Sequence, residues 1–173
     1  MNTNDEWYTP KEFIQSLGEF DLDPATCIQA MKINHAAKKI YTQDDDGLKQ
    51  VWEGRVWLNP PYSYPLQRLF LEKMVEHNNG IVLTSSRIDS KWFHDVILKS
   101  ASAIMLLYDR IKFFNSNGVQ GKQPKNGSIL IAFGKENAEI LQKSKIKGRF
   151  FILSNDEKKN RDDKFLNRQT DDK

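Results

Sequence analysis

The sequence is poor in residues that could tie the chain together covalently or through a metal. Its 173 residues include one cysteine, Cys27, and three histidines. One cysteine cannot form an internal disulfide, and with three scattered histidines it does not make up a structural zinc site of four ligands. We therefore expect no bound metal and a fold that is stabilised by packing.

Long apolar runs and a large excess of charge are also missing. No apolar run approaches the ~20 residues that a membrane-spanning helix needs. The first residues, MNTNDEWYTP, have neither the basic region nor the apolar stretch of a signal peptide. These absences predict a cytoplasmic protein with no membrane partner. The net charge of +3 permits an anionic partner without requiring one.

What the chain does contain fits one compact domain, since domains average about 150 residues. Short apolar runs alternate with helix-like stretches, which is typical of an α/β fold with a largely parallel sheet and flanking helices. We expect this domain over residues 1–154. Residues 155–173 hold six acidic and six basic side chains and few apolar ones, which predicts a disordered or loosely docked tail.

Apolar spacing, proline and glycine predict the individual elements. Thr9 is the expected N-cap of the first helix, and Pro10 takes its first position. Helices are expected over residues 10–17, 25–38, 66–77 and 90–99. Strands are expected over residues 20–23, 39–42, 55–58, 81–83, 103–108, 128–133 and 148–153, with a long loop over 114–127.

The motif Asn59-Pro60-Pro61-Tyr62 directly follows an expected strand, at the end where open α/β sheets bind ligands. The Asn59 side chain offers one oxygen, and the main chain of Pro60 offers a second whose direction the two prolines restrain. Two such oxygens can accept both N–H bonds of an aromatic amine, such as adenine N6, while that nitrogen attacks a methyl donor. Tyr62 can stack on the base, which has to leave the duplex. The alternative is a rigid double-proline turn with Asn59 as a local cap.

Several further segments carry a family resemblance when they are taken together and in order. They are residues 7–10 (Trp-Tyr-Thr-Pro), 21–25 (Asp-Leu-Asp-Pro-Ala), 45–48 (Asp-Asp-Gly-Leu) with Trp52, 56–63 (Val-Trp-Leu-Asn-Pro-Pro-Tyr-Ser), 87–94 (Arg-Ile-Asp-Ser-Lys-Trp-Phe-His) and 110–113 (Arg-Ile-Lys-Phe). This set resembles the Dam-like DNA N6-adenine methyltransferases of bacteriophages and prophages over roughly residues 5–134.

The resemblance implies a Rossmann-like, site-specific DNA adenine methyltransferase that uses S-adenosylmethionine in a bacterial cell. By this likeness Asn59, Pro60, Pro61 and Tyr62 hold the target base. The residues that it assigns to the methyl donor are Trp7, Thr9, Pro10, Asp21, Asp23 and Asp46. The glycine-rich turn that many methyltransferases have after the first strand is absent here.

Carboxylates can replace that turn, because they accept hydrogen bonds from an ammonium or from ribose hydroxyls. Alternation along a strand would place Asp21 and Asp23 on one face. Alternatively, Asp23 caps a helix and Asp21 is solvated. We interpret the acidic run 44–46 as a turn or a ribose contact rather than a magnesium site.

Duplex DNA is the expected partner, and contact is expected where basic residues occur without acidic ones. No acidic residue lies between Arg110 and Lys135, although this stretch could also be a solvated loop. The predicted DNA-binding residues are Arg87, Lys91, Arg110, Lys112, Lys122 and Lys125. Because so small a chain leaves little surface for reading sequence, we expect a short site or the help of a second subunit in a homodimer.

Two other functions fit the same residues. One is a DNA-binding module that has lost catalysis, and the other is methylation of RNA or of a glutamine amide, whose planar NH₂ could occupy the same acceptors. The biological role, in restriction–modification or in regulation, stays open.

Overall fold

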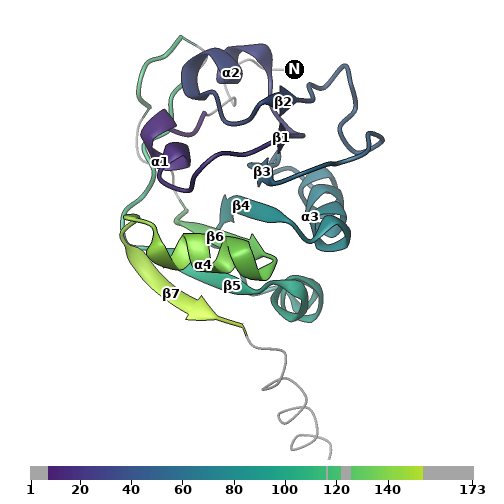
Figure 1. Ribbon diagram of the computed structural model, residues 1–173, viewed down its shortest axis with the longest axis vertical. Helices are drawn as coiled ribbons and strands as arrows, with labels where there is room; N and C mark the ends of the chain where they lie inside the picture. The colour runs from purple at the N-terminus through teal and green to yellow at the C-terminus, as the bar shows by residue number, and fades with distance from the viewer. Residues whose placement is uncertain (1–7, 116, 122–125, 154–173) are drawn as a thin grey trace, which may run out of the picture.

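The computed structural model describes residues 8–115, 117–121 and 126–153 (Figure 1). Its elements are α1 (Lys11–Gln15), β1 (Leu22–Asp23), α2 (Ile28–Asn34), β2 (Lys39–Ile40), β3 (Val56–Leu58), α3 (Leu66–His77), β4 (Gly80–Ser85), the π-helix η1 (Phe93–Leu98), β5 (Ala103–Leu107), β6 (Ser128–Phe133), α4 (Lys135–Lys143) and β7 (Gly148–Ile152).

The strands form one seven-stranded sheet in the order β2-β1-β3-β4-β6-β5-β7. β2, β1, β3 and β4 run parallel to one another. β6 is antiparallel to both β4 and β5, and β7 is antiparallel to β5. The mixed α/β architecture with flanking helices is thus confirmed, but the sheet is not wholly parallel, because β6 returns between β4 and β5.

Both faces of the sheet are covered, so its central strands are buried apolar runs. Trp57 lies on the face covered by α1 and α4, whereas its neighbours Val56 and Leu58 lie on the face covered by α3 and η1. This alternation follows from the twofold repeat of a strand. Figure 1 shows α4 lying over β5 and β6, with which it makes its strand contacts.

The predicted elements are present, and the ends of most of them are shifted. The helix expected over residues 25–38 is shorter, since the Cys27 thiol accepts a hydrogen bond from the Ala30 amide at its start and His35 is left-handed (φ 46°) at its end. The helix expected over residues 90–99 is the π-helix η1, and α4 was not predicted. The tail from residue 155 lies outside the described residues. In the part of the chain that is described, no helix is long and apolar enough to cross a membrane.

Candidate active site

A cavity of about 630 Å³ lies at the carboxyl ends of β1 and β3. From β1 the chain passes to β2 on one side and later returns to β3 on the other, so the strand order reverses between β1 and β3. Open α/β sheets bind ligands in the crevice at such a switch point. The volume is in the range of sites that enclose cofactors and other small molecules.

Asn59 lines this cavity because it is the first residue after β3. Its Nδ2 lies 3.5 Å from the hydroxyl oxygen of buried Thr9, and its Oδ1 accepts a hydrogen bond of 3.3 Å from the Tyr62 hydroxyl. The two contacts orient the amide, with its oxygen toward Tyr62. Because Oδ1 has two lone pairs, it can accept a second N–H while Tyr62 stays in place.

Tyr62 lies in the bend beside the cavity and is not one of the residues that line it. The residue is 47% exposed, yet its hydroxyl lies on Asn59, and desolvation raises the pKa of Tyr62 to about 12. The hydroxyl is therefore protonated at neutral pH and acts as a donor. Of the other two motif residues, Pro61 lines the cavity and Pro60 is buried.

Asp23 forms another side of the cavity, at the end of β1. The residue is only 4% exposed, and its Oδ1 accepts a hydrogen bond of 3.2 Å from the Ala25 amide. Among the described residues no lysine or arginine forms an ion pair with it. Burial raises its pKa to about 7 against the opposing hydrogen bonds from Ala25 and Thr26. A buried carboxylate at a cavity wall is suited to a ligand that brings hydrogen-bond donors or a positive charge.

The loop between β2 and β3 forms a third wall. Asp46 lines the cavity in a left-handed conformation (φ 52°) and pairs with Lys49 at 2.8 Å. At Gly47 a Cβ atom would lie 2.0 Å from the carbonyl oxygen of Pro24, so the loop can approach β1 only with glycine here. The Trp52 indole N–H donates to the Gly47 carbonyl at 2.8 Å and holds the loop in place.

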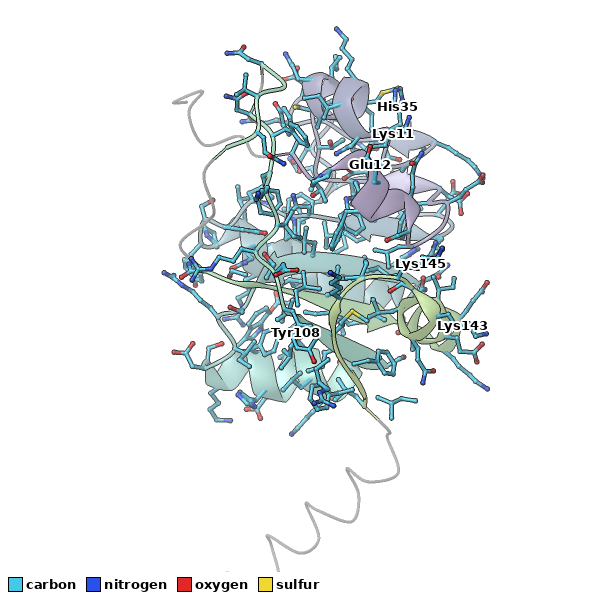
Figure 2. All side chains as sticks on the ribbon, turned by 90° about the vertical axis from the view of Figure 1, so that its left-hand side faces the viewer. Lys11, Glu12, His35, Tyr108, Lys143 and Lys145 are labelled. Carbon is cyan, nitrogen blue, oxygen red and sulfur yellow. The ribbon has the colours of Figure 1, made fainter. Side chains whose placement is uncertain are left out.

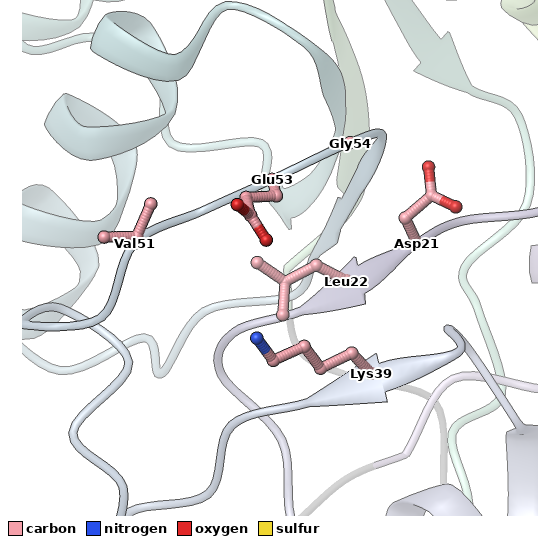
Figure 3. A pocket seen from close by; sticks show the side chains of 6 residues that line it. All are labelled: Asp21, Leu22, Lys39, Val51, Glu53 and Gly54. Carbon is pink, nitrogen blue, oxygen red and sulfur yellow. The ribbon is translucent and has the colours of Figure 1, made fainter.

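Asp21 does not join Asp23 in this cavity. It precedes β1, and its carboxylate accepts hydrogen bonds from the Arg55 amide (2.9 Å) and from Lys38 Nζ (3.1 Å), which lower its pKa. It lines a separate cavity of about 270 Å³ at the amino end of β1, together with Lys39 and Glu53 (Figure 3). The expected alternation fails because Asp21 lies in a bend rather than in the strand.

Of the other residues predicted to contact the methyl donor, only some line the cavity. Thr9 lines the cavity, whereas Pro10, which directly precedes α1, does not. Trp7 lies outside the described residues. Sequence reasoning did not select Tyr8 and Cys27, which line the cavity and are joined by a hydrogen bond of 3.2 Å from the thiol to the tyrosine hydroxyl. Tyr8 could have been selected from the sequence, because it belongs to the segment 7–10 that carries the family resemblance.

The predicted DNA-binding residues lie mostly at the surface. Arg87, Lys91, Arg110 and Lys112 are exposed, and Lys91 is paired with Asp95. Lys122 and Lys125 lie outside the described residues. The loop predicted over residues 114–127 begins beside the cavity, because the main chains of Phe114 and Tyr8 exchange hydrogen bonds of 2.7 and 2.9 Å. Within the described residues no group of three or more His, Cys, Asp or Glu side chains is placed to hold a metal ion.

Comparison with known proteins shows a family and a relative that this chain resembles. A family profile described as DNA N-6-adenine-methyltransferase (Dam) matches residues 1–165. A DNA N-6-adenine-methyltransferase of Escherichia phage T1 is 35% identical over 123 residues, which are 65% of this chain and 49% of the phage protein. The chain thus spans about half the length of that relative. No solved structure matches the chain.

Proposed function

Because the chain belongs to the DNA N-6-adenine-methyltransferase (Dam) family, as its sequence predicted, we propose that it transfers a methyl group from S-adenosylmethionine to N6 of an adenine in duplex DNA. One observation carries the proposal. The oriented amide of Asn59 and the buried carboxylate of Asp23 line the same cavity, at the point where the strand order reverses. We infer that the sheet is a Rossmann-like methyltransferase sheet, with the donor and the target base meeting in this cavity.

The residues of the cavity fit the donor. S-adenosylmethionine would supply an electrophilic methyl group on a sulfonium, together with an ammonium and ribose hydroxyls as hydrogen-bond donors. The Asp23 carboxylate can accept from these donors, and an ammonium beside it would favour its ionised form. Thr9 and Asp46 line the same space, and we retain both as donor contacts. For Asp21 we propose instead a structural role, in which it holds the turn at Arg55.

Asn59 and Pro60 are proposed to hold the amino group of an extruded adenine. Oδ1 of Asn59 and the main-chain oxygen of Pro60 each accept one N6–H, so both protons stay engaged while positive charge develops on N6. Since the Asn59 oxygen is already oriented by Thr9 and Tyr62 in the free protein, little reorganisation of this side chain is needed at that moment. The exposed ring of Tyr62 offers a stacking surface for the base, which offsets part of the cost of flipping.

DNA is proposed to lie over the mouth of the cavity, near the start of the loop over residues 114–127, where Phe114 is hydrogen-bonded to Tyr8. The lysines and arginines would contact phosphates and set the position of the duplex. We retain Arg87, Lys91, Arg110, Lys112, Lys122 and Lys125 as proposed contacts, with Lys91 weakened by its pairing with Asp95.

A transfer experiment with labelled donor tests the proposed function. The full chain is incubated with S-adenosylmethionine labelled on its methyl group and, in separate reactions, with unmethylated DNA, RNA and a protein extract. The nucleosides or amino acids are then analysed for label. We expect label in N6-methyl-2′-deoxyadenosine from DNA, and none on a control duplex that is already N6-methylated at every adenine. Label confined to RNA or protein would support methylation of those substrates and overturn the proposed function. DNA binding without any label would support a DNA-binding module that has lost catalysis, and would also overturn it.

A further inference from the structure

We propose that two copies of this chain associate through β7, in antiparallel pairing centred on Phe150, to form one continuous sheet. β7 is the last strand of the sheet and pairs with β5 along one edge. Among the described residues no strand pairs with its other edge. Pairing through β7 is independent of the proposed methyl transfer.

The hydrogen bonds to β5 show which groups of β7 face the free edge. The Leu153 amide donates to the Ser102 carbonyl at 2.8 Å, and the Lys147 carbonyl accepts from the Tyr108 amide at 3.1 Å. Backbone groups alternate in direction along an antiparallel pair, so the odd-numbered residues of β7 face β5. The N–H and C=O groups of Gly148, Phe150 and Ile152 therefore face outward.

This set of outward groups is complementary to itself. A twofold axis at Phe150 places Gly148 opposite Ile152 of the second copy, and Phe150 opposite its equivalent. Each of these pairs joins two outward-facing residues, so each can exchange two hydrogen bonds, about six in all. A shift of one residue would instead set outward groups against inward ones.

The side chains of β7 match across the same axis. Phe151 is 43% and Ile152 is 70% exposed, although both lie in a strand. Arg149 forms no ion pair with a described acidic residue. When the twofold axis lies at Phe150, Arg149 lies opposite Phe151 of the second copy. These two residues form a non-hydrogen-bonded pair, the type in which opposite side chains are closest. A guanidinium over an aromatic ring is favourable there.

The strand lacks the features that usually block such pairing. Its sequence, Gly-Arg-Phe-Phe-Ile, contains no proline and one charge. Exposed Tyr108 directly follows β5 and donates its amide to the Lys147 carbonyl, just before β7 (Figure 2). One short strand buries less than the ~1,000 Å² of a stable interface, so we expect a weak dimer that depends on concentration. The cavity lies beyond β4, β6 and β5 from this edge and stays open in the dimer.

Sedimentation velocity of the full chain between about 1 and 100 µM tests the pairing, since weak dimers dissociate in this range. We expect the average mass to rise from 20.1 kDa toward twice that value. Ile152→Pro removes one outward N–H and leaves the hydrogen bonds to β5 intact. This variant should therefore stay monomeric at all concentrations, with little change in melting temperature. Ile152→Thr keeps the N–H and should still dimerise. Phe151→Pro removes an inward N–H and should lower the melting temperature instead.

Disulfide trapping provides a second measurement that does not depend on a proline variant folding. In a Cys27→Ser background, Arg149→Cys and Phe151→Cys chains are mixed under mild oxidation. We expect a 149–151 crosslink between the two chains, and none when Glu139→Cys on α4 replaces either partner. A wild-type mass that stays at the monomer value over the whole range, an Ile152→Pro variant that dimerises like the wild type, or no crosslink on mixing would each overturn the proposal.

Discussion

Asn59 is held by two hydroxyl groups that come from different parts of the chain. Thr9 lies 50 positions earlier and Tyr62 three positions later, and both contact the same amide. Side-chain contacts of this kind fix which end of the amide is the acceptor. In the proposed function this orientation gives Asn59 its role, and Tyr62 has two separable roles, as donor to Asn59 and as stacking surface.

Replacing Tyr62 separates these roles. Tyr62→Ala should weaken capture of the flipped base by about 1–3 kcal/mol, because it removes the stacking ring. Tyr62→Phe keeps the ring and should retain most of the capture. Fluorescence of 2-aminopurine at the target position measures capture, and calorimetry should show unchanged donor binding in both variants. Tyr64→Ala, at a tyrosine that is 81% exposed in the same turn, is the matched control. Equal loss of base capture and donor binding in Tyr62→Ala would contradict the stacking role.

Burial of the Asp23 carboxylate lowers the free energy of unfolding when the group is ionised. Its pKa of about 7 lies above the value of 3.8 expected in the unfolded chain. As pH rises from about 4 to 7, the unfolded chain releases this proton and the folded protein retains it, so folding stability falls across this window and levels off above it. The cost amounts to about 4 kcal/mol on the scale of 1.36 kcal/mol per pKa unit.

Asp23→Asn removes that titration. The free energy of unfolding of the variant, relative to the wild type, should rise by ~2–3 kcal/mol between pH 5 and pH 8. Urea unfolding of both proteins at the two pH values measures this difference. Donor binding should be weaker in the variant at both pH values, because the amide cannot form an ion pair with the ammonium. A stability difference that is the same at pH 5 and pH 8 would show that Asp23 is not a buried titrating group.

Among the elements, the loop between β2 and β3 most directly shapes the cavity. Its approach to β1 is permitted by Gly47, and it is tied down by Trp52 and by Lys73, whose Nζ donates to the carbonyls of Leu48 (2.6 Å) and Gln50 (2.7 Å). A loop held by this many contacts forms a fixed wall.

Gly47→Ala should displace this wall, because the added methyl group meets a backbone atom that cannot rotate away. We expect a loss of stability of about 1–3 kcal/mol and at least a tenfold loss of donor affinity. Thermal unfolding and calorimetry measure the two effects. Asp44→Ala, at an exposed position of the same loop, should change neither. Donor affinity at the wild-type level in Gly47→Ala would contradict the role assigned to the loop.

The elements were largely predictable because their signals are local. Residues 66–77 have helical apolar spacing with Gly80 following, and residues 128–133 form an unbroken apolar run, so α3 and β6 match their predicted ranges. The place of β6 between β4 and β5 was not predictable, since it depends on pairing between segments distant in sequence. The separation of Asp21 from Asp23 was not predicted either, because it also depends on pairing between distant strands. β1 begins only at Leu22, where pairing with β2 and β3 starts.

On the scale of the whole molecule, charge governs how DNA is approached rather than how the chain folds. The exposed cations Arg87 and Lys112 should each contribute to the salt dependence of DNA binding. Replacing either by alanine should reduce the slope of log K against log salt by about 0.9, the value for one phosphate contact. Lys91→Ala should have a smaller effect, because Asp95 already neutralises that charge.

Fluorescence anisotropy of a labelled duplex between about 50 and 200 mM salt measures these slopes. Slopes that stay at the wild-type value in both Arg87→Ala and Lys112→Ala would place the DNA on another face of the molecule.

The proposed methyl transfer depends on the Asn59 amide, which accepts the amino group that becomes methylated. This role can be measured in single-turnover methyl transfer by Asn59→Ala, with donor and DNA both saturating. The variant should transfer the labelled methyl group about 10²–10³ times more slowly than the wild type, because a preoriented acceptor is lost at the moment when charge develops. Transfer by Asn59→Ala at the wild-type rate would show that the Asn59 amide does not hold the reacting amino group.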